Sequence, residues 1–328
     1  MPPEAQPKVA AAVVTWNSLQ DIPACLDSLL KQTFRLSTIV VVDNASTDGT
    51  ADLVSSKYPG VLLLRQNRNA GFARGNNIGM AVVEADWILT LNPDAYIDSE
   101  YVSKLLKYAE NRPRIGALTG KLLSVDGTLI DSAGIEIYQS RRVRDRGHGL
   151  PDEGAWDVAE QVFGVCAAAG LYRREMLNDV SPDGEIFPER FFSYYEDADL
   201  AWRAWRRNWA AWYVPEAVGW HRRGGSPVGS RFSRYLTHRN RLWLIARNEP
   251  LCNPLGYPIP FIKHEFLMLL RMLRYPYLFK ATLAALCGLP AALKYRRLFK
   301  IESRAKPPFK KGSGFKLTFD GRRSLGSK

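Results

Sequence analysis

Cysteine is scarce in this sequence and follows no metal-binding pattern. The 328 residues include four cysteines, Cys25, Cys166, Cys252 and Cys287, with no Cys-x-x-Cys pair. This spacing excludes a zinc ribbon and provides no disulfide framework, which favours a reducing compartment. No signal peptide is expected, because the first residues lack a basic segment followed by an apolar one.

Long apolar runs are also missing. The longest charge-free run near the C-terminus, Ala281–Leu293, is shorter than the ~20 residues that a membrane-spanning helix needs. We therefore expect a chain that does not cross the membrane. A hydrophobic content of 46% with 24% charged residues indicates a globular protein, and no repeat of fixed period is visible.

Most of the chain has no excess of positive charge. Residues 261–328 contain 16 Lys and Arg against 3 Asp and Glu, whereas the other 260 residues contain 29 against 30. The excess behind the net charge of +12 therefore lies in the C-terminal fifth. A basic block confined in this way indicates an anionic partner, either lipid or nucleic acid.

Short apolar segments alternate with amphipathic ones over about the first hundred residues. We expect buried strands at Val9–Thr15 and Thr38–Val42 and further strands at Val61–Arg65 and Trp87–Leu91. Helices are expected at Asp21–Gln32, Thr47–Tyr58 and Asn76–Val83. This alternation predicts an α/β fold with a central, mostly parallel sheet, in which ligands gather beyond the carboxyl ends of the strands.

The pattern changes twice in the rest of the chain. Residues 115–195 indicate mixed strands and loops, followed by a helix at Glu196–Asn208 and a strand at Ala210–Tyr213. From Phe232 onward we expect leucine-rich helices that break at Pro258, Pro260, Pro276 and Pro290. These changes predict an α/β domain over residues 8–230, a helical region over 231–305 and a basic, disordered tail over 306–328.

Two polar segments of the α/β domain suit a nucleotide. Asp43, at a strand end, can accept hydrogen bonds from a nucleobase or ribose, whereas Ser46–Thr50 would equally well cap the next helix. Asn67–Gly79 combines three glycines with Arg68 and Arg74, which suits phosphate, although a flexible loop has the same composition. Its spacing matches neither a dinucleotide fingerprint nor a P-loop.

Three further clusters can carry metal or acid–base chemistry. Asp94 follows a strand, where a carboxylate can help hold a divalent cation on a diphosphate; an ordinary turn is the alternative. Glu196, Asp197 and Asp199 follow an aromatic run, where desolvation raises a carboxylate pKa toward that of a general base; the alternative is a favoured helix start. His221 precedes two arginines and can be either a metal ligand or a structural histidine.

In this order and spacing, the clusters resemble the family-2 glycosyltransferases, in particular the bacterial rhamnosyltransferase-like branch. The resemblance covers about residues 8–245 and rests on Val14–Asn17, Asp43–Thr50, Asn69–Asn76, Asn92–Asp94, Glu196–Leu200, and His221 before Gly224–Ser226. It implies a GT-A type nucleotide-sugar-binding domain.

The resemblance also implies roles for individual residues. Asp43 would hold the nucleobase, and the nucleotide site would further comprise Thr15, Asn17, Arg68, Gly71, Arg74, Asn76 and Asn92. Arg222 and Arg223 would face the diphosphate.

The same resemblance implies the reactive centre. Asp94 and His221 would hold Mg²⁺ or Mn²⁺. Asp197 would be the catalytic base, with Glu196 and Asp199 orienting it or the acceptor. The first acid of the family's metal motif is Asn92 here, so this metal site carries fewer charges.

These roles predict an inverting hexosyltransferase that uses dTDP-rhamnose or a UDP-sugar. A base deprotonates the acceptor hydroxyl, and the cation neutralises the departing nucleoside diphosphate. The alternatives are a UDP-hexose transferase with another glycan acceptor and a nucleotidyltransferase, although the first strand lacks the Gly-rich, Lys-containing start of the latter. A non-catalytic membrane- or nucleic-acid-binding scaffold is the alternative of another class, against which Asp94, Asp197 and His221 argue.

The segment Phe261–Phe299 interleaves apolar and aromatic side chains with cations. This pattern is typical of a helix in the plane of a membrane interface, although a helical cap on the sheet is the alternative. We therefore expect a peripheral protein at the cytoplasmic face of the cell membrane, bound to anionic lipid beside a lipid-linked glycan acceptor of cell-envelope polysaccharide synthesis. Nucleic acid is disfavoured, because the aromatics lie among leucines. The oligomeric state is left open.

Overall fold

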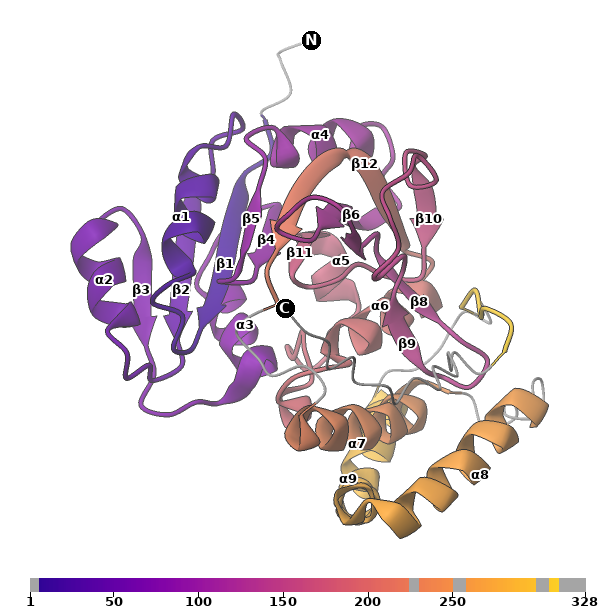
Figure 1. The fold of residues 1–328 in the computed structure, drawn as a ribbon. Coiled ribbons are helices and arrows are strands. Elements are labelled where there is room, and N and C mark those ends of the chain that lie inside the picture. Colours follow the sequence, from indigo (N-terminus) through magenta and orange to yellow (C-terminus); the bar gives the residue numbers. More distant parts are fainter. Residues whose placement is uncertain (1–5, 224–229, 250–257, 299–306, 313–328) are drawn as a thin grey trace, which may run out of the picture.

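A ten-stranded sheet forms the centre of the computed structural model, which describes residues 6–223, 230–249, 258–298 and 307–312 (Figure 1). Its strands are β1 (Val9–Thr15), β2 (Thr38–Asp43), β3 (Leu62–Arg65), β4 (Trp87–Leu91), β5 (Ala95–Ile97), β6 (Ile115–Leu123), β7 (Ile130–Ser132), β10 (Glu160–Val162), β11 (Ala169–Arg173) and β12 (Ala210–His221). The main path runs β10-β12-β6-β11-β4-β1-β2-β3, with β5 on β12 and β7 on β6. A separate small sheet pairs β8 (Ile135–Ile137) with β9 (Val143–Asp145).

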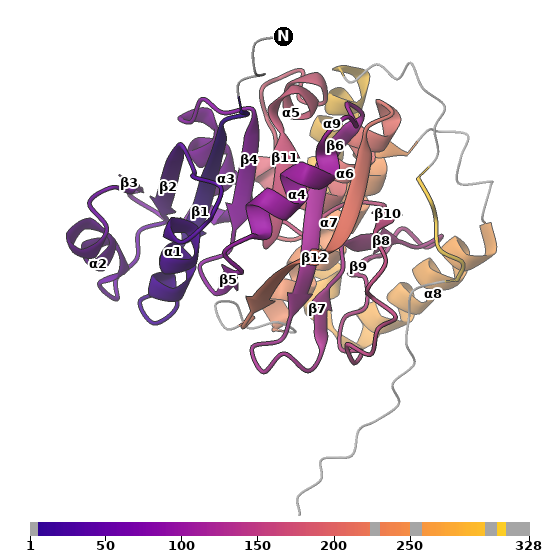
Figure 2. The ribbon, with the colours of Figure 1, turned by 90° about the horizontal axis from the view of Figure 1, so that it is seen from above.

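The N-terminal half of the sheet is parallel, as the alternating pattern predicts. Strand β1 lies between β2 and β4, and β3 continues beyond β2. All of β1 is buried, because helices cover both faces (Figure 2). Helices α1 (Ile22–Leu30) and α4 (Tyr101–Ala109) pack on one face and α3 (Gly71–Ala81) on the other, while α2 (Thr50–Lys57) lies beside β3.

Later strands extend this sheet and carry site residues to it. Strand β11 runs antiparallel between β4 and β6, and β12 lies parallel to β6. β12 continues past the predicted end at Tyr213, because a register shift between Val214 and Val218 accommodates Pro215, which has no N–H for the ladder. Helices α5 (Arg174–Asp179) and α6 (Glu196–Arg206) pack on the same face as α3.

The glycine-rich segment lies inside helix α3. This helix begins at Gly71 rather than at the predicted Asn76. A Cβ on Gly75 would lie 2.6 Å from Val14 Cγ1, and one on Gly79 would lie 3.3 Å from the Cβ of Ala12. Two of the three glycines therefore allow close packing of α3 on β1.

Three helices follow the sheet: α7 (Arg231–Asn248), α8 (Pro258–Arg274) and α9 (Pro276–Leu298). Pro258 and Pro276 occupy first helical positions, which proline favours. Pro260 and Pro290 lie inside α8 and α9, so the helix breaks predicted there are wrong. Pro260 is tolerated because the N–H groups of a first helical turn have no partner within the helix.

Helix α9 packs closely on α7 in the turn before Pro290. The ring of Trp243 lies where a Cβ on Gly288 would be, and its indole N–H donates to the Ala285 carbonyl at 2.9 Å. Within the part of the chain that the structure describes, α9 is the one helix long and apolar enough to cross a membrane, over Pro276–Arg297. The charge-free run Ala281–Leu293 therefore underestimates the length of this helix, because α9 extends beyond the run at both ends.

Helix α7 shares buried contacts with the α/β domain. Its Arg247 donates to Asp199 of α6 at 2.9 Å. The domain boundary near residue 230 stays a prediction. Residues 307–312, expected to be disordered, lie against β8, where the Lys310 N–H donates to the Ile137 carbonyl at 2.8 Å. The rest of the predicted tail lies outside the described residues.

Candidate active site

A cavity of about 710 Å³ opens beyond the carboxyl ends of β1 and β4. The predicted site residues that line it are Thr15, Gly71, Asn92, Asp94, Glu196, Asp197, His221 and Arg223. They come from segments far apart in the sequence. The parallel pairing of β1 with its neighbours and the antiparallel pairing of β5 with β12 bring these segments together.

Three buried oxygen atoms at the ends of β1 and β2 have no partner among the described residues, and two of their residues, Thr15 and Asn44, line the cavity. They are Thr15 Oγ1, Asp43 Oδ1 and Asn44 Oδ1. Thr15 lies opposite Asp43 in the β1–β2 register, and the other Asp43 oxygen accepts a hydrogen bond from the Ser46 N–H at 3.1 Å. Since buried acceptors without donors are costly, this end suits a ligand that brings N–H or O–H groups, such as a nucleobase.

Gly71 is required where α3 meets the loop before α6. Its φ is +89°, and a Cβ there would lie 2.5 Å from the carbonyl oxygen of Phe192. The Ala73 N–H donates to that carbonyl at 3.1 Å. The glycine thus allows close backbone contact within the protein, while its contact with a nucleotide stays a prediction.

Some predicted nucleotide and diphosphate residues do not line the described cavity: Asn17, Asp43, Arg68, Arg74, Asn76 and Arg222. Asn76 is buried and donates to a backbone carbonyl of its own helix at 3.0 Å. Arg74 and Arg222 instead form surface ion pairs with Glu189 and Asp21. Their contacts with a nucleotide sugar stay predictions, and the segment Gly224–Ser226 lies outside the described residues.

Asp94 and His221, the predicted metal pair, lie side by side. Asp94 Oδ1 is 3.2 Å from His221 Nε2, and the Asn92 amide nitrogen is 3.3 Å from the same Nε2. The described residues contain no group of three or more His, Cys, Asp or Glu side chains that could hold a metal ion. A cation at this pair would therefore take its other ligands from a diphosphate or water, in keeping with the lower charge expected from Asn92.

Asp131 of β7, which sequence reasoning did not identify, holds the opposite side of His221. Its Oδ2 lies 2.8 Å from His221 Nδ1, so Nε2 is directed to Asp94. Burial alone would lower the pKa of His221, but the hydrogen bonds to Asp131 and Asp94 raise it to about 9. Carboxylates commonly orient metal-binding histidines in this way.

Arg223 connects this pair to the surroundings of Asp197. Its guanidinium pairs with Asp131 and, at 2.6 Å, with Asp145 Oδ2 of β9. Burial would lower the pKa of Arg223, but the two carboxylates raise it. The side chain is therefore a fixed positive charge in the cavity wall, and its contact with a diphosphate stays a prediction.

Asp197 and Glu196 form the first turn of α6 at the cavity wall. Asp197 Oδ1 accepts a hydrogen bond from the Ala198 N–H at 2.7 Å. Burial, then the charge of Asp145, raises the pKa of Asp197 to about 7, and burial together with Asp197 raises the pKa of Glu196. A carboxylate that titrates near neutral pH is suited to accept a proton from a hydroxyl.

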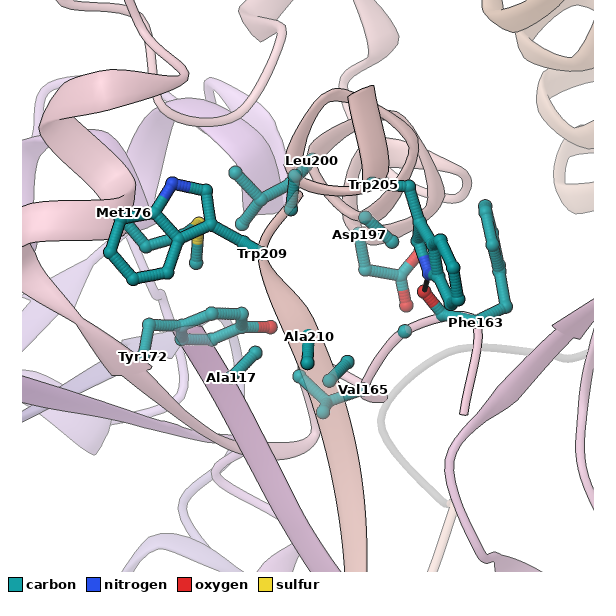
Figure 3. A pocket seen from close by; sticks show the side chains of 14 residues that line it. Ala117, Phe163, Val165, Tyr172, Met176, Asp197, Leu200, Trp205, Trp209 and Ala210 are labelled. Atoms are coloured by element: carbon teal, nitrogen blue, oxygen red, sulfur yellow. Dashed lines mark hydrogen bonds between the residues drawn. The ribbon is translucent and has the colours of Figure 1, made fainter. Parts of the chain in front are cut away.

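A small void lies beside Asp197 (Figure 3). Its lining is mostly apolar and includes Met176, Leu200 and Trp209, and the hydroxyl of Tyr172 points into it. These side chains keep bulk water from one side of the Asp197 carboxylate. Burial of this kind is the first cause of the raised pKa of Asp197, and the charge of Asp145 is the second.

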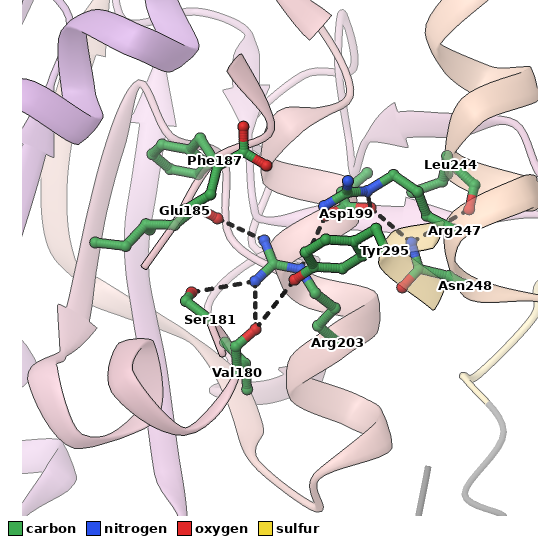
Figure 4. Close-up of polar contacts among 12 residues, drawn as sticks. Val180, Ser181, Glu185, Phe187, Asp199, Arg203, Leu244, Arg247, Asn248 and Tyr295 are labelled. Atoms are coloured by element: carbon green, nitrogen blue, oxygen red, sulfur yellow. Dashed lines mark hydrogen bonds and ion pairs between the residues drawn. The ribbon is translucent and has the colours of Figure 1, made fainter. Parts of the chain in front are cut away.

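Asp199 lies away from the cavity, so its placement does not support the predicted role in orienting the base or acceptor. It is fully buried and accepts hydrogen bonds from Arg203 of α6 at 2.8 Å and from Arg247 and Asn248 of α7 at 2.9 and 2.6 Å (Figure 4). The Arg247 guanidinium stacks 3.5 Å from the ring centroid of Tyr295 in α9. Asp199 therefore joins α6 to the C-terminal helices.

The far end of the cavity is built by β8 and β9 of the α/β domain and by α7, which the sequence assigned to the helical region. The lining there comprises Phe232, Ser233, Leu236 and Thr237 of α7 with Ile135, Val143 and Arg144 of β8 and β9. Phe232 packs edge-on against Phe192, with 5.9 Å between ring centroids. No local sequence signal marks these residues, because tertiary packing alone brings α7 to the site.

Comparison with known proteins identifies the family of this chain. Residues 11–180 match the model of glycosyl transferase family 2. The chain is similar to N-acetylglucosaminyl-diphospho-decaprenol L-rhamnosyltransferase of Mycobacterium tuberculosis, with 27% identity over 261 residues, covering 72% of this chain and 83% of the relative. It is also similar to a PGL/p-HBAD biosynthesis glycosyltransferase of Mycobacterium bovis, with 28% identity over 183 residues, covering 54% and 64%.

Solved structures share the fold. Residues 1–349 of S. aureus TarS, in complex with UDP-GlcNAc, give a TM-score of 0.57 at 20% identity, covering 89% of this chain and 90% of that chain. The mannosyltransferase PcManGT from Pyrobaculum calidifontis, in complex with GDP-Man and Mn²⁺, gives 0.54 at 18% identity, covering 90% and 86%. The predicted GT-A type fold and the resemblance to rhamnosyltransferases are thus confirmed. This chain belongs to glycosyl transferase family 2, the enzymes that transfer sugars.

Proposed function

We propose that the protein is an inverting glycosyltransferase that moves rhamnose from dTDP-rhamnose to a hydroxyl of a lipid-linked saccharide in cell-envelope polysaccharide synthesis. The observation that carries the proposal is the convergence of Asp197, Asp94 and His221 on one cavity. The M. tuberculosis relative is named as a rhamnosyltransferase for N-acetylglucosaminyl-diphospho-decaprenol, which supports this class of donor and acceptor.

In this proposal, different side chains would accept the proton and bind the nucleotide. Asp197 would take the proton of the acceptor hydroxyl as its oxygen attacks the anomeric carbon. Attack from the face opposite the nucleotide inverts that carbon. Thr15 and Asp43 would accept hydrogen bonds from the nucleotide, since their buried oxygens have no donor among the described residues.

Asp94 and His221 would hold Mg²⁺ or Mn²⁺. When bound, the cation would offset the negative charge of the departing nucleoside diphosphate. The fit rests on a carboxylate oxygen and an imidazole nitrogen 3.2 Å apart, with His221 fixed from behind by Asp131. Two protein ligands leave room for diphosphate oxygens, which a hard divalent cation prefers.

Helices α8 and α9 support peripheral attachment to an anionic membrane at its cytoplasmic face. Their exposed apolar side chains are Ile259, Ile262, Phe266, Leu269, Leu270, Leu273, Phe279, Leu283 and Leu286. The same helices carry Lys263, Arg271, Arg274, Lys280 and Lys294, which complement anionic headgroups. An enzyme held at this surface would meet a lipid-linked acceptor there.

A thermal-shift screen of nucleotide sugars tests the donor. With Mn²⁺ present, dTDP-rhamnose should raise the Tm more than UDP-GlcNAc or GDP-mannose. A ligand that binds only the folded protein stabilises it, and the ligand that binds most tightly stabilises it most. The gain should shrink on chelation of the metal. Stabilisation by a UDP-sugar alone would identify that sugar nucleotide as the donor in place of dTDP-rhamnose. No stabilisation by any nucleotide sugar would contradict the proposal.

A further inference from the structure

The loop that leads into the Glu196–Asp197 turn has a strained backbone. Phe192, Tyr194 and Tyr195 have φ values of 67°, 71° and 72°. Positive φ is unfavourable for bulky aromatic residues, since the Cβ approaches the backbone. Such a conformation persists only where surrounding contacts hold it, and it is concentrated at functional sites.

Asn240 of α7 supplies such contacts. Its side chain is fully buried, and its amide nitrogen lies 2.9, 2.8 and 2.8 Å from the carbonyl oxygens of Phe191, Ser193 and Tyr194. The amide oxygen accepts from Arg239 Nε at 3.0 Å, which fixes the orientation of the amide. One side chain thus holds three backbone carbonyls of the strained loop.

The loop is held from the opposite side by helix α3. The Phe192 carbonyl accepts a hydrogen bond from the Ala73 N–H at 3.1 Å, at the point where Gly71 permits close approach. The loop therefore lies between the helix of the nucleotide end and α7. Asp197 follows it directly, so the loop backbone determines where the carboxylate stands.

We propose that Asn240 is a positioning residue for sugar transfer, which fixes the strained loop 191–195 and thereby the place of Asp197 relative to the donor. This inference rests on the proposed function, because Asn240 affects sugar transfer only if Asp197 is the catalytic base. It assigns α7 to the catalytic unit, although the sequence places α7 beyond the α/β domain.

The substitution Asn240→Asp tests the proposal with almost no change in shape. It keeps the oxygen that accepts from Arg239 but replaces the N–H donors by a carboxylate oxygen facing three carbonyls. We expect kcat for rhamnose transfer to fall ~100-fold while the KM for the donor changes less than ~3-fold, because misplacement affects the reacting geometry more than nucleotide binding. The lower limb of the kcat–pH profile should also leave its wild-type position, because the new carboxylate and the water that follows it change the surroundings of Asp197 and Glu196.

Asn77→Ala is the matched control. Asn77 of α3 also bonds a backbone segment by its side-chain amide, donating to the Phe187 carbonyl at 2.8 Å and accepting from the Phe187 N–H at 2.9 Å. That segment precedes the strained loop, so the variant should lose thermal stability but keep kcat and the pH profile. An equal loss of kcat in both variants, or a folded Asn240→Asp enzyme with wild-type kcat and pH profile, would overturn the proposal.

Limited proteolysis separates this inference from the proposed function. Chymotrypsin, which cleaves after aromatic residues, should cut the loop 191–195 faster in Asn240→Asp than in the wild type or Asn77→Ala. That result supports the hold of Asn240 on loop 191–195 even if dTDP-rhamnose proves to be the wrong donor. Equal cleavage in all three proteins would overturn the positioning role of Asn240 while leaving the proposed transferase function intact.

Discussion

His221 Nε2 and Asp94 Oδ1 lie 3.2 Å apart although 127 positions separate the two residues in the chain. The antiparallel pairing of β5 with β12 creates this proximity, since it sets His221 opposite Ala95. Asp131, on the other side of the imidazole, directs Nε2 to the cavity. The pair is therefore built into the fold.

Removal of the orienting carboxylate should weaken metal use. In Asp131→Asn, we expect the Mn²⁺ concentration for half-maximal transfer to rise ~10–100-fold, because the imidazole of His221 loses its fixed direction. Metal titration of the initial rate measures this. Asp126→Asn, an exposed carboxylate in the loop before β7, should leave the titration unchanged, and an unchanged Asp131→Asn titration would contradict the orienting role.

The reaction should depend on pH through Asp197. A base acts when deprotonated, and the pKa of Asp197 is raised to about 7, so kcat should fall as the pH drops below about 7 and level off above it. Asp145→Asn should move this limb to lower pH, because it removes a negative charge that raises the pKa of Asp197. A limb that stays in place would show that Asp145 does not act on the base.

Asp199 should prove structural. Asp199→Ala leaves Arg203 and Arg247 buried without their carboxylate, which should cost ~3–5 kcal/mol of unfolding free energy. Denaturant unfolding measures this loss. The exposed pair of Asp52 and Arg65, 2.7 Å apart, provides the control, since Asp52→Ala should cost at most ~1 kcal/mol. A fully stable Asp199→Ala protein with altered transfer would contradict this assignment.

Membrane attachment should depend on the exposed apolar side chains of α8. Combined substitution of Phe266, Leu269 and Leu273 by serine should reduce flotation with vesicles that contain phosphatidylglycerol, because these side chains are 57%, 58% and 83% exposed. Val158→Ser, at a position 72% exposed outside these helices, is the control. Unchanged flotation would contradict attachment through α8, and resistance to alkaline carbonate would indicate that α9 spans the bilayer.

The sequence predicts the parallel half of the fold well, because its strands are continuous apolar runs. The predicted strands Val9–Thr15 and Trp87–Leu91 agree with β1 and β4 at both ends. Asp43, Asp94 and Asp197 were recognisable because each follows or begins a regular element at the same edge of the sheet.

Long-range partners could not be predicted in the same way. Asp131 lies in a short strand of three residues, and its role depends on long-range contacts with His221 and Arg223. Asn240 is an ordinary polar position of a helix until α7 packs on the loop before α6. The same limit applies to Asp199, whose acidic neighbours suggested an active-site role although its partners lie in α7.

The most direct test is transfer of rhamnose by the wild type and by Asp197→Asn under the same conditions. Labelled dTDP-rhamnose is supplied with N-acetylglucosaminyl diphosphate on a short prenyl chain, and donor binding is followed by thermal shift. We predict labelled lipid product with the wild type, and a loss of ~100-fold or more in Asp197→Asn with donor binding retained. Equal product from the two proteins would contradict the account.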